Sequence, residues 1–390
     1  MTAISSPIDR LGECLRVIER LVGFQTESSK SNLDLIEWIE RRLSRQGVPF
    51  VRLPNRDGDK AAIFATIGPM IEGGVVLSGH TDVVPVSGQA WTSDPFKLRR
   101  DGGRLYGRGA CDMKGFVGVA LAMAEEFLGA GLRRPIHFLF TYDEETTCLG
   151  PIDAISRFGA DLPRPGCVIV GEPTSMQVAD EHKAVTSYVT MVRGREAHSS
   201  KPAQGGNAIE AACALVCELY RFAGDQPQGS SRFDPPGSTL SVGVIGGGTA
   251  RNILARECAF EWEFRCEPDA AEDAALRALE TFGSSLVLPR LRQNAPEARI
   301  DTKVAVAVPG LRAQPGSAAE TLALRLTRSN RTVAAPFASE AGRLQGAGLP
   351  TILCGPGSID QAHQPDEFVD IAQIESCIDF LRRLAADLAA

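Results

Sequence analysis

The sequence predicts an α/β fold: a main domain with a mainly parallel sheet between helices, and a second domain inserted into it. Strand-like and helical segments alternate as far as about residue 180, which is typical of a parallel sheet covered by helices. From about 183 to 308 the order becomes β-α-β-β-α-β, the ferredoxin-like arrangement. The chain has 390 residues, more than one core usually accommodates. The expected domains are therefore 1–182 with 309–390, and 183–308.

The expected helices of the main domain have apolar residues at helical spacing. The first is expected over about residues 7 to 23, and the second begins near Ser31, a residue type suited to cap a helix. The others are expected at Phe116–Leu128, Ser317–Leu326 and Ile371–Leu388. The inserted domain is expected to contain strands at Thr186–Val192, Thr239–Val244, Cys258–Phe264 and Ile300–Val306, and helices at Asn207–Phe222 and Ala271–Phe282.

Four apolar strands of the main domain run directly into potential metal ligands. They are Val75–Gly79 before His80, Ile136–Tyr142 before Asp143-Glu144-Glu145, Cys167–Val170 before Glu172, and Thr351–Cys354 before the loop that reaches His363. Because ligands bind outside the carboxyl ends of parallel strands, we expect these side chains to meet at one edge of the sheet. One ligand from each strand end (His, Glu, Glu and His) together with Asp112 gives five donors. This set suits two zinc-like ions that share a carboxylate.

Composition narrows the function classes. The formal net charge of −7 disfavours a nucleic-acid partner, since there is no surplus of positive charge to neutralise phosphates. The sequence has no run of about 18 apolar residues, so no membrane span is predicted. No signal peptide is apparent. Ten cysteines are scattered without a Cys-x-x-Cys motif, which indicates free thiols in a reducing compartment. The expected location is the cytoplasm.

The segment His80-Thr81-Asp82 has the form of a metal ligand with a supporting carboxylate. In an extended segment both side chains point the same way, so Asp82 could accept the second N–H of the imidazole. The alternative is a loop histidine with an unrelated aspartate nearby. The other strand ends favour the ligand hypothesis.

The acidic triplet Asp143-Glu144-Glu145 would be costly to hold together without a compensating positive charge. A solvated acidic turn is the alternative, but the preceding strand directs the triplet to the expected site. Adjacent acids can divide the work, one binding metal and the next acting as a general base. Taken alone, Asp112 would be a helix N-cap, and Glu172 or His363 a surface residue; only the combination makes them ligands.

Three residues of the inserted domain are weaker candidates. His198 follows the first strand and would otherwise be a cap or a surface histidine. Asn252 ends the turn Gly246–Asn252, which lacks the lysine of a phosphate-binding loop. Arg265 would pair with Glu261 or Glu263, or instead bind a substrate carboxylate with its planar guanidinium.

The chain resembles the M20 family of zinc-dependent amidohydrolases and peptidases over nearly its whole length. The motifs that carry the resemblance, in family order, are Ser78–Asp82, Gly107–Gly115, Asp143–Glu145, Gly171–Thr174, Ala197–Ser199 and Gly247–Asn252. The segment Cys354–Phe368 is more similar to the acetylornithine deacetylase branch than to the desuccinylase branch. Ser339 stands where threonine is frequent in the family, near a segment that contacts substrate.

The resemblance implies a role for each matching position. His80 and Glu172 would hold one zinc ion, Glu145 and His363 the other, and Asp112 would bridge them, with Co²⁺ as an alternative metal. Glu144 would be the general base and Asp82 would orient His80. His198 would reach the active site of a partner subunit in a homodimer formed through the lid/dimerisation domain 183–308. Asn252, Arg265 and Ser339 would bind substrate, and the Asp112–Met113 peptide bond is expected to be cis.

The expected activity is therefore hydrolysis of the amide bond of an N-acyl amino acid, a small molecule. The leading substrate is N-acetyl-L-ornithine, which would place the reaction in arginine biosynthesis. Within the same chemistry, the alternatives are succinyl-diaminopimelate desuccinylase, aminoacylase or dipeptidase activity. From another class, a non-catalytic, metal-stabilised binding protein is disfavoured because a structural site needs no free base such as Glu144. An oxidoreductase is disfavoured because no Gly-x-Gly-x-x-Gly turn follows the first strand.

Overall fold

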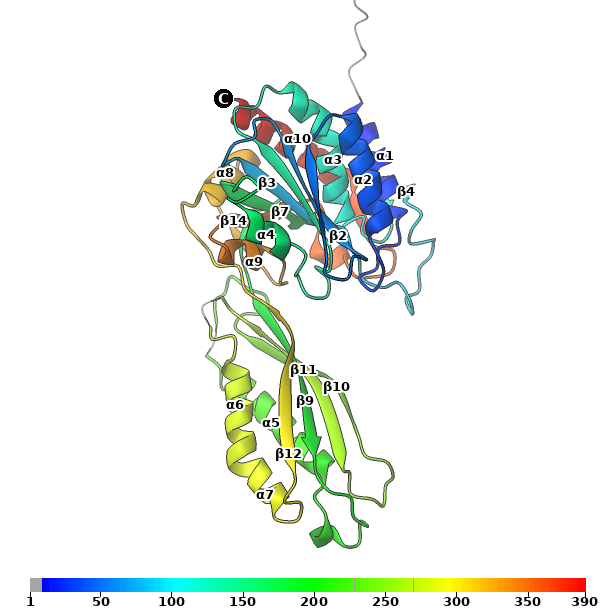
Figure 1. The fold of residues 1–390 in the computed structure, drawn as a ribbon, viewed down its shortest axis with the longest axis vertical. Helices are drawn as coiled ribbons and strands as arrows, with labels where there is room; N and C mark the ends of the chain where they lie inside the picture. Colours follow the sequence, from blue (N-terminus) through cyan, green and yellow to red (C-terminus); the bar gives the residue numbers. More distant parts are fainter. Residues whose placement is uncertain (1–8, 228, 269) are drawn as a thin grey trace, which may run out of the picture. The chain divides into compact units, whose positions relative to one another are not determined.

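The computed structural model describes residues 9–227, 229–268 and 270–390. The chain divides into two compact units (Figure 1). Unit 1 comprises the chain up to Glu181 together with Ala313–Ala335 and Ser339–Ala390, and unit 2 comprises His182–Arg312 with Pro336–Ala338. These bounds lie close to the predicted division at 183–308. Residues 7 and 8 of the first expected helix lie outside the described residues.

Unit 1 is built on an eight-stranded sheet in the order β1-β2-β6-β3-β7-β14-β8-β13. Its four central strands are mutually parallel: β6 (Ile136–Thr141), β3 (Val75–His80), β7 (Cys167–Pro173) and β14 (Thr351–Gly355). The flanking strands are β1 (Phe50–Pro54), β2 (Ala61–Ile67), β8 (Ala179–His182) and β13 (Val333–Ala335). Because β2 and β8 run antiparallel to their central neighbours, the predicted parallel sheet is confirmed for its centre.

Helices cover both faces of this sheet, which is why its central strands are buried throughout. One face packs into a continuous core with α1 (Arg10–Val22), α2 (Leu33–Arg45), α3 (Lys114–Gly129), α8 (Ala318–Thr327) and α10 (Ile371–Ala389). Two short helices, α4 (Ile152–Arg157) and α9 (Ala341–Gly346), lie on the other face (Figure 1). There Phe158, directly after α4, packs edge-on against Phe64 of β2.

Glycines set how closely α3 approaches the central strands. A Cβ at Gly171 of β7 would lie 2.0 Å from the ring of Phe116, which occupies that space. A Cβ at Gly79 of β3 would lie 3.0 Å from both the Met113 and Val117 side chains. The start of α3 therefore rests directly on the strand ends, and it brings the preceding residue Asp112 to the edge of the sheet.

A small three-stranded sheet in the order β15-β5-β4 lies beside these elements in unit 1. Its strands are β4 (Arg99–Asp101), β5 (Arg104–Tyr106) and β15 (Phe368–Asp370). It pairs the segment before Asp112 with the segment after His363. The sequence analysis did not predict this sheet.

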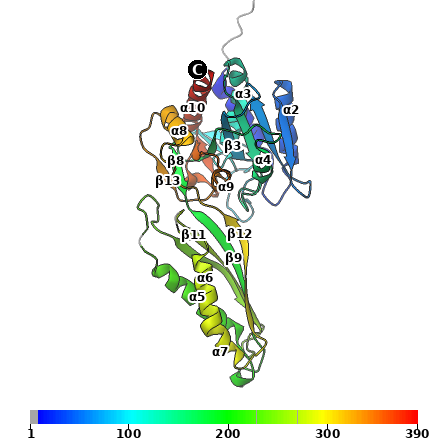
Figure 2. The same ribbon diagram turned by 60° about the vertical axis from the view of Figure 1, so that its left-hand side comes forward.

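Unit 2 has a four-stranded antiparallel sheet in the order β10-β11-β9-β12. The strands are β9 (Ala184–Arg193), β10 (Thr239–Gly247), β11 (Glu257–Cys266) and β12 (Arg299–Val308). The helices α5 (Ala208–Gly224), α6 (Ala274–Phe282) and α7 (Leu288–Arg292) pack on one face, where they form a separate core (Figure 2). In chain order this is the predicted β-α-β-β-α-β arrangement.

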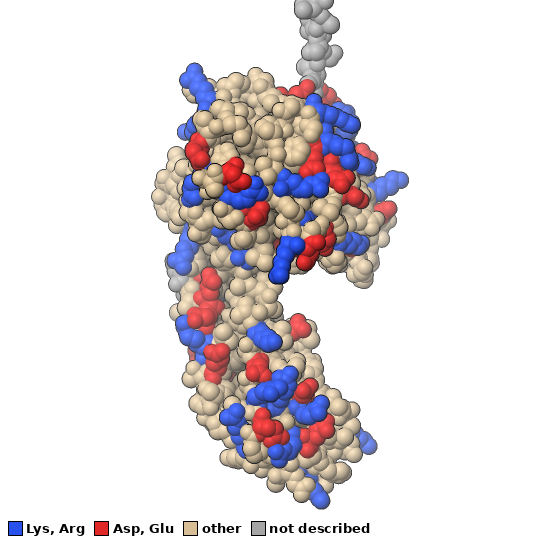
Figure 3. Space-filling model, in the orientation of Figure 1, with Lys and Arg blue, Asp and Glu red and all other residues tan. Residues whose placement is uncertain are grey.

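The surface carries charges of both signs (Figure 3), and the cysteines are unpaired. On the face shown in Figure 3, basic and acidic side chains are interspersed in each unit rather than separated by sign. All ten cysteines are free thiols. Among the helices of the described ranges, none combines the length and hydropathy that a membrane span requires.

Candidate metal centre

The carboxyl ends of the central strands bring the predicted ligands together in unit 1. His80 is the last residue of β3, Glu172 lies near the end of β7, and the acidic triplet follows β6 after one intervening residue. Asp112 lies two residues before α3, and His363 lies in the loop between β14 and β15. The parallel arrangement thus places ligands from distant parts of the sequence at one edge, as predicted.

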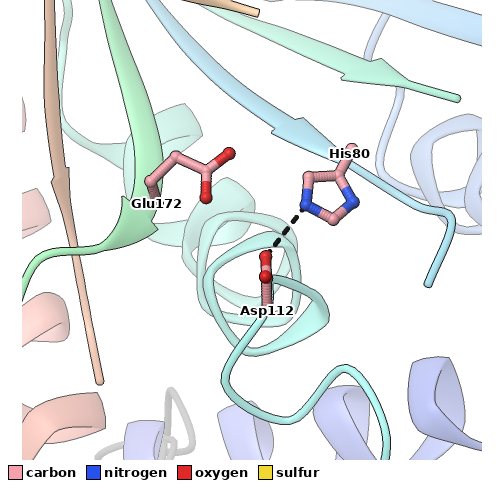
Figure 4. A group of neighbouring side chains, drawn as sticks. All are labelled: His80, Asp112 and Glu172. Atoms are coloured by element: carbon pink, nitrogen blue, oxygen red, sulfur yellow. Dashed lines mark hydrogen bonds and ion pairs between the residues drawn. The ribbon is translucent and has the colours of Figure 1, made fainter. Parts of the chain in front are cut away.

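The first group consists of His80, Asp112 and Glu172, all buried, whose ligand atoms lie within 4.8 Å of one another. Figure 4 shows the three side chains pointing toward one another from β3, β7 and the start of α3. His80 Nε2 is 3.0 Å from Asp112 Oδ1. The Oε1 atom of Glu172 is buried and has no hydrogen-bond partner among the described residues. A buried carboxylate oxygen without a partner is costly, so this atom fits a metal ligand.

The second group consists of Asp112, Glu145 and His363, again with ligand atoms within 4.8 Å. His363 Nε2 lies 3.2 Å from Asp112 Oδ2 and 3.0 Å from Glu145 Oε2. The other oxygen of Asp112, Oδ1, faces His80. One carboxylate therefore turns a different oxygen to each group, and the donors suit two divalent cations that share it.

The second group is more accessible than the first. The His363 side chain is 49 % exposed, whereas that of His80 is 1 % exposed. The first group is therefore enclosed, and the second has a ligand that faces solvent. An open coordination position is what a catalytic metal site needs in order to bind water or substrate.

Burial and crowding shift the ionisation of these groups in the metal-free protein. Burial raises the pKa of Glu172 well above its ordinary range, and the charges of Glu144 and Asp112 add to the rise. Burial also raises the pKa of Glu145. Burial opposes protonation of His80, but its hydrogen bond to Asp112 and the nearby carboxylates raise its pKa well above the usual value. The histidines thus supply the positive charge that bound cations would otherwise provide.

The pKa values of Asp112 and His363 shift in opposite directions. The pKa of Asp112 is lowered despite burial, because His363 and His80 both hydrogen-bond to it. Hydrogen bonds to Asp112 and Glu145 raise the pKa of His363 to about 10. The Asp112–Met113 peptide bond is cis, as expected. Met113, rather than Asp112, occupies the N-cap position of α3, so the capping alternative for Asp112 is not observed.

Glu144 lies beside both groups without belonging to either. Its Oε2 is 3.9 Å from His80 Nε2. Burial raises its pKa well above the ordinary range, and the neighbouring acids raise it further. The first acid of the triplet, Asp143, turns away and pairs with Lys60 at 2.5 Å. The three adjacent acids therefore have three different environments: Asp143 pairs with Lys60, Glu145 with His363, and Glu144 has only the more distant His80.

Asp82 lies next to His80, but the contact differs from the predicted one. His80 Nδ1 is 2.9 Å from the main-chain carbonyl of Asp82 and 3.6 Å from its carboxylate. The carboxylate instead accepts hydrogen bonds from the main-chain N–H groups of Glu144 and Glu145 and from Ser28. The reason is that β3 ends at His80, so the extended geometry assumed for His-x-Asp does not continue. Asp82 contacts both His80 and the acidic triplet.

None of the other predicted site residues is a member of these two groups. In unit 2, His198 is exposed and its Nδ1 is 2.8 Å from Ser200 Oγ, and the main-chain carbonyl of Asn252 accepts a hydrogen bond from Ser199. Arg265, on β11, forms an ion pair with Glu263 at 2.9 Å, one of the two alternatives that its sequence position left open. Ser339 belongs to unit 1, is fully buried, and accepts a hydrogen bond from the Ala341 N–H.

Sequence reasoning missed a buried carboxyl group behind the strand ends. Glu340 accepts hydrogen bonds from Ser78 at 2.6 Å and from Thr141 at 2.7 Å. Ser78 lies two residues before His80, and Thr141 lies two residues before the acidic triplet. Glu340 therefore ties together the two strands that deliver these ligands. The sequence signal available was a carboxylate beside Ser339 in an otherwise apolar segment, which is too weak to assign a role.

Comparison with known proteins agrees with this geometry. The profile of the family described as Peptidase family M20/M25/M40 matches residues 76–387. Acetylornithine deacetylase of Pasteurella multocida is 32 % identical over 389 residues, 95 % of this chain and 96 % of that protein. The crystal structure of aminopeptidase PepT from Bacillus cereus is similar in fold, with 16 % identity, a TM-score of 0.77, and coverage of 97 % of this chain and 99 % of that one.

A second solved structure bears on the metal groups. The YXEP protein of Bacillus subtilis, described as a dinuclear metal-binding peptidase of the M20 family, has a TM-score of 0.68 and 15 % identity. The match covers 96 % of this chain and 98 % of that one. At such low identity the likeness concerns the fold, and the ligand groups described above come from this chain itself.

Proposed function

The chain belongs to peptidase family M20/M25/M40 and is a metal-dependent amidohydrolase, and on that premise we propose that it removes the acyl group from an N-acyl amino acid. The leading substrate is N-acetyl-L-ornithine, with L-ornithine and acetate as products. The observation that supports the reaction is the unliganded carboxylate of Glu144 beside two groups of metal-binding side chains.

The two groups divide the proposed metal binding between them. His80 and Glu172 would hold one ion, Glu145 and His363 would hold the other, and Asp112, which belongs to both groups, would be shared. Zinc is the proposed metal because imidazole and carboxylate donors suit it, and Co²⁺ is an alternative. Such ions, when bound, supply Lewis-acid polarisation of the amide carbonyl and make an attacking water more acidic.

Glu144 is the proposed proton carrier. It takes a proton from the water that attacks the amide carbon, and it returns that proton to the nitrogen as the C–N bond breaks. Burial raises the pKa of Glu144 well above its ordinary range, and a raised pKa makes a carboxylate a stronger base. Asp82 accepts the main-chain N–H of Glu144 at 3.2 Å and so helps to fix the base relative to His80.

Unit 2 carries the proposed lid and dimerisation functions. A homodimer would form through residues 183–308, and His198 of the partner subunit would help to stabilise the oxyanion. Two observations support it: His198 is exposed, and the edge strand β10 carries exposed Val244 and Ile245. An unpaired apolar edge strand is prone to pair with another chain.

Asn252, Arg265 and Ser339 are proposed to bind the substrate, the first two at its carboxylate. Because Arg265 already pairs with Glu263, a substrate carboxylate would have to replace that acid. A guanidinium suits the exchange, since it forms paired hydrogen bonds with any carboxylate. The proposed location is the cytoplasm, supported by ten free thiols, and the proposed pathway is arginine biosynthesis.

The decisive experiment measures amine release by the metal-loaded chain, with and without a chelator. The panel contains N-acetyl-L-ornithine, N-succinyl-diaminopimelate, other N-acetyl amino acids and a dipeptide. Chelator-sensitive turnover led by N-acetyl-L-ornithine supports the full proposal. Turnover led by another compound keeps the reaction and replaces the substrate, with desuccinylase, aminoacylase or dipeptidase activity as the outcome. Bound metal without any turnover would instead favour a non-catalytic binding protein.

A further inference from the structure

A buried ion pair lies behind the shared metal ligand and takes no part in the proposed chemistry. Arg108 Nη1 is 2.6 Å from Glu367 Oε2, and the two side chains are 1 % and 0 % exposed. Pairs buried to this degree are costly to desolvate, and other hydrogen bonds usually satisfy their remaining atoms. The other contacts of Arg108 and Glu367 therefore show what this pair holds in place.

Glu367 fixes the main chain at Asp112. Its second oxygen, Oε1, accepts the N–H of Asp112 at 3.0 Å and that of Cys111 at 2.9 Å. Its own carbonyl accepts the N–H of Gly107 at 2.9 Å. Three hydrogen bonds from one residue thus position the short segment that carries the shared carboxylate.

Gln89 connects the same pair to the second metal group. Its Oε1 accepts hydrogen bonds from Arg108 and from Trp91. Its Nε2 donates to the main-chain carbonyl of His363 at 2.8 Å. A continuous set of hydrogen bonds therefore runs from the main chain of His363, through Gln89, Arg108 and Glu367, to the main chain of Asp112.

We propose that Gln89, Arg108 and Glu367 are positioning residues that hold the main chains of Asp112 and His363 in place, so that their side chains can bind one cation together. The inference rests on the two-metal site of the proposed function. His363 is half exposed and lies in a loop, so the metal groups alone do not fix its position. Partners behind metal ligands commonly change metal affinity or activity by about 10–100-fold when they are replaced.

Two variants test the two ends of this set of hydrogen bonds separately: Glu367→Gln changes the Asp112 end, and Gln89→Glu changes the His363 end. In Glu367→Gln a single acceptor oxygen cannot serve both Arg108 and the two N–H groups, so the Asp112 segment loses support. Because Asp112 belongs to both groups, both metal-binding steps should weaken by about 10–100-fold. In Gln89→Glu the carboxylate still accepts from Arg108 and Trp91 but cannot donate to His363. Metal should then bind more weakly only to the group that contains His363.

The measurement is a Co²⁺ titration of the metal-free chain, followed by visible absorption and calorimetry, with thermal unfolding of the metal-free chain alongside. The matched control is Asp370→Asn, which removes an equivalent carboxylate from the exposed Arg104–Asp370 pair three residues from Glu367. The control should bind Co²⁺ as the unaltered chain does. If Glu367→Gln does not fold, the partly buried Gln89 position still provides the test.

The outcomes distinguish this inference from the proposed function. The positioning role is supported if Gln89→Glu weakens Co²⁺ binding only at the group with His363, while the control variant keeps both Co²⁺ affinities. Lower thermal stability with unchanged Co²⁺ affinities would overturn that role, since a purely structural pair would behave in this way. If the unaltered chain binds no Co²⁺ at all, the two-metal site and the inference both fail.

Discussion

The thiol of Cys148 contacts Glu144 at two points: Sγ is 3.2 Å from its carbonyl oxygen and 3.5 Å from its Oε1. Cys148 is 3 % exposed, and burial raises the pKa of its thiol well above the usual value. The thiol is therefore a neutral hydrogen-bond donor next to the proposed base. Glu144 is held from one side by this thiol and from the other by the Asp82 carboxylate.

Cys148→Ala should lower kcat several-fold and leave the metal content unchanged, because it removes a donor from the carboxylate of Glu144. Cys148→Ser should restore most of the rate, since a hydroxyl can donate to the same oxygen. Steady-state kinetics and metal analysis on both variants test this. Equal rates in the Ala and Ser variants would show that the contact with Glu144 does not affect turnover.

Glu144→Gln should reduce kcat by about 10²–10⁴-fold, the usual contribution of a positioned proton carrier. Most of the metal should stay bound, because Glu144 is outside both ligand groups. Asp143→Asn is the matched control: it changes the adjacent acid, whose partner is Lys60. Single-turnover rates and metal content distinguish the two. A similar loss in both variants would argue against Glu144 as the base.

Replacing the two histidine ligands should have unequal effects on stability. His80→Ala leaves Asp112 with one fewer partner in a buried environment, and breaking such a pair costs about 3–5 kcal/mol. His363→Ala, at a half-exposed position, should cost much less. Each variant should lose about one metal equivalent. Metal analysis and urea unfolding of the metal-free variants provide the readouts, and equal destabilisation would contradict the difference in burial.

His198→Ala should slow turnover without loss of metal, because His198 lies in unit 2 and outside both ligand groups. The lower rate would come from loss of the proposed hydrogen-bond donor to the developing oxyanion. Loss of such a donor raises the reaction barrier by about 2.7–4 kcal/mol in other enzymes. Mixing His198→Ala with inactive Glu144→Gln should restore part of the activity if the histidine acts across a dimer. Parallel loss of metal and rate would exclude this role.

Acidification should destabilise the fold through His137, which is buried in β6. Burial lowers its pKa to about 4, although a hydrogen bond to the Gly73 carbonyl opposes the shift. In the unfolded chain the pKa is about 6.5. Between these values the unfolded state binds the proton and the folded state does not, so the free energy of unfolding falls as pH drops from about 6.5 to about 4.

His137→Gln should reduce that pH dependence by about one proton over the same interval. Urea unfolding at several pH values measures it. His198→Ala, which removes an exposed histidine, is the control and should keep the slope of the unaltered chain. An unchanged slope in His137→Gln would mean that another group causes the acid sensitivity. His182, buried with a pKa lowered to about 4, contributes in the same direction.

The ligand positions could be predicted because they depend on a few local signals. Apolar runs that end in His80 or Glu172 leave alternatives open one by one, but together they predict a shared site, since the ends of parallel strands meet at one edge. The inserted unit was equally clear, because its alternating strands and helices have lengths that fit only a few arrangements. Helix boundaries shifted by a few residues, as at α2, where Asn32 rather than Ser31 is the N-cap.

The supporting residues could not be predicted, because each depends on contacts between segments far apart in sequence. Glu340 meets Ser78 and Thr141 only after three segments have packed together. Arg108 and Glu367 each lie within four residues of a ligand, which in retrospect was the available signal. Their pairing becomes visible only once β5 and β15 lie side by side.

The glycines beneath Phe116 have a consequence for how this centre can change. Gly79 and Gly171 are not metal ligands. A methyl group at position 171 would nevertheless push the Phe116 ring, and α3 with it, away from the sheet. Asp112 would move with the helix, and both cation positions would open although every ligand was retained. A search for inactivating variants restricted to ligands and base would miss position 171, where loss of function would come from added bulk alone.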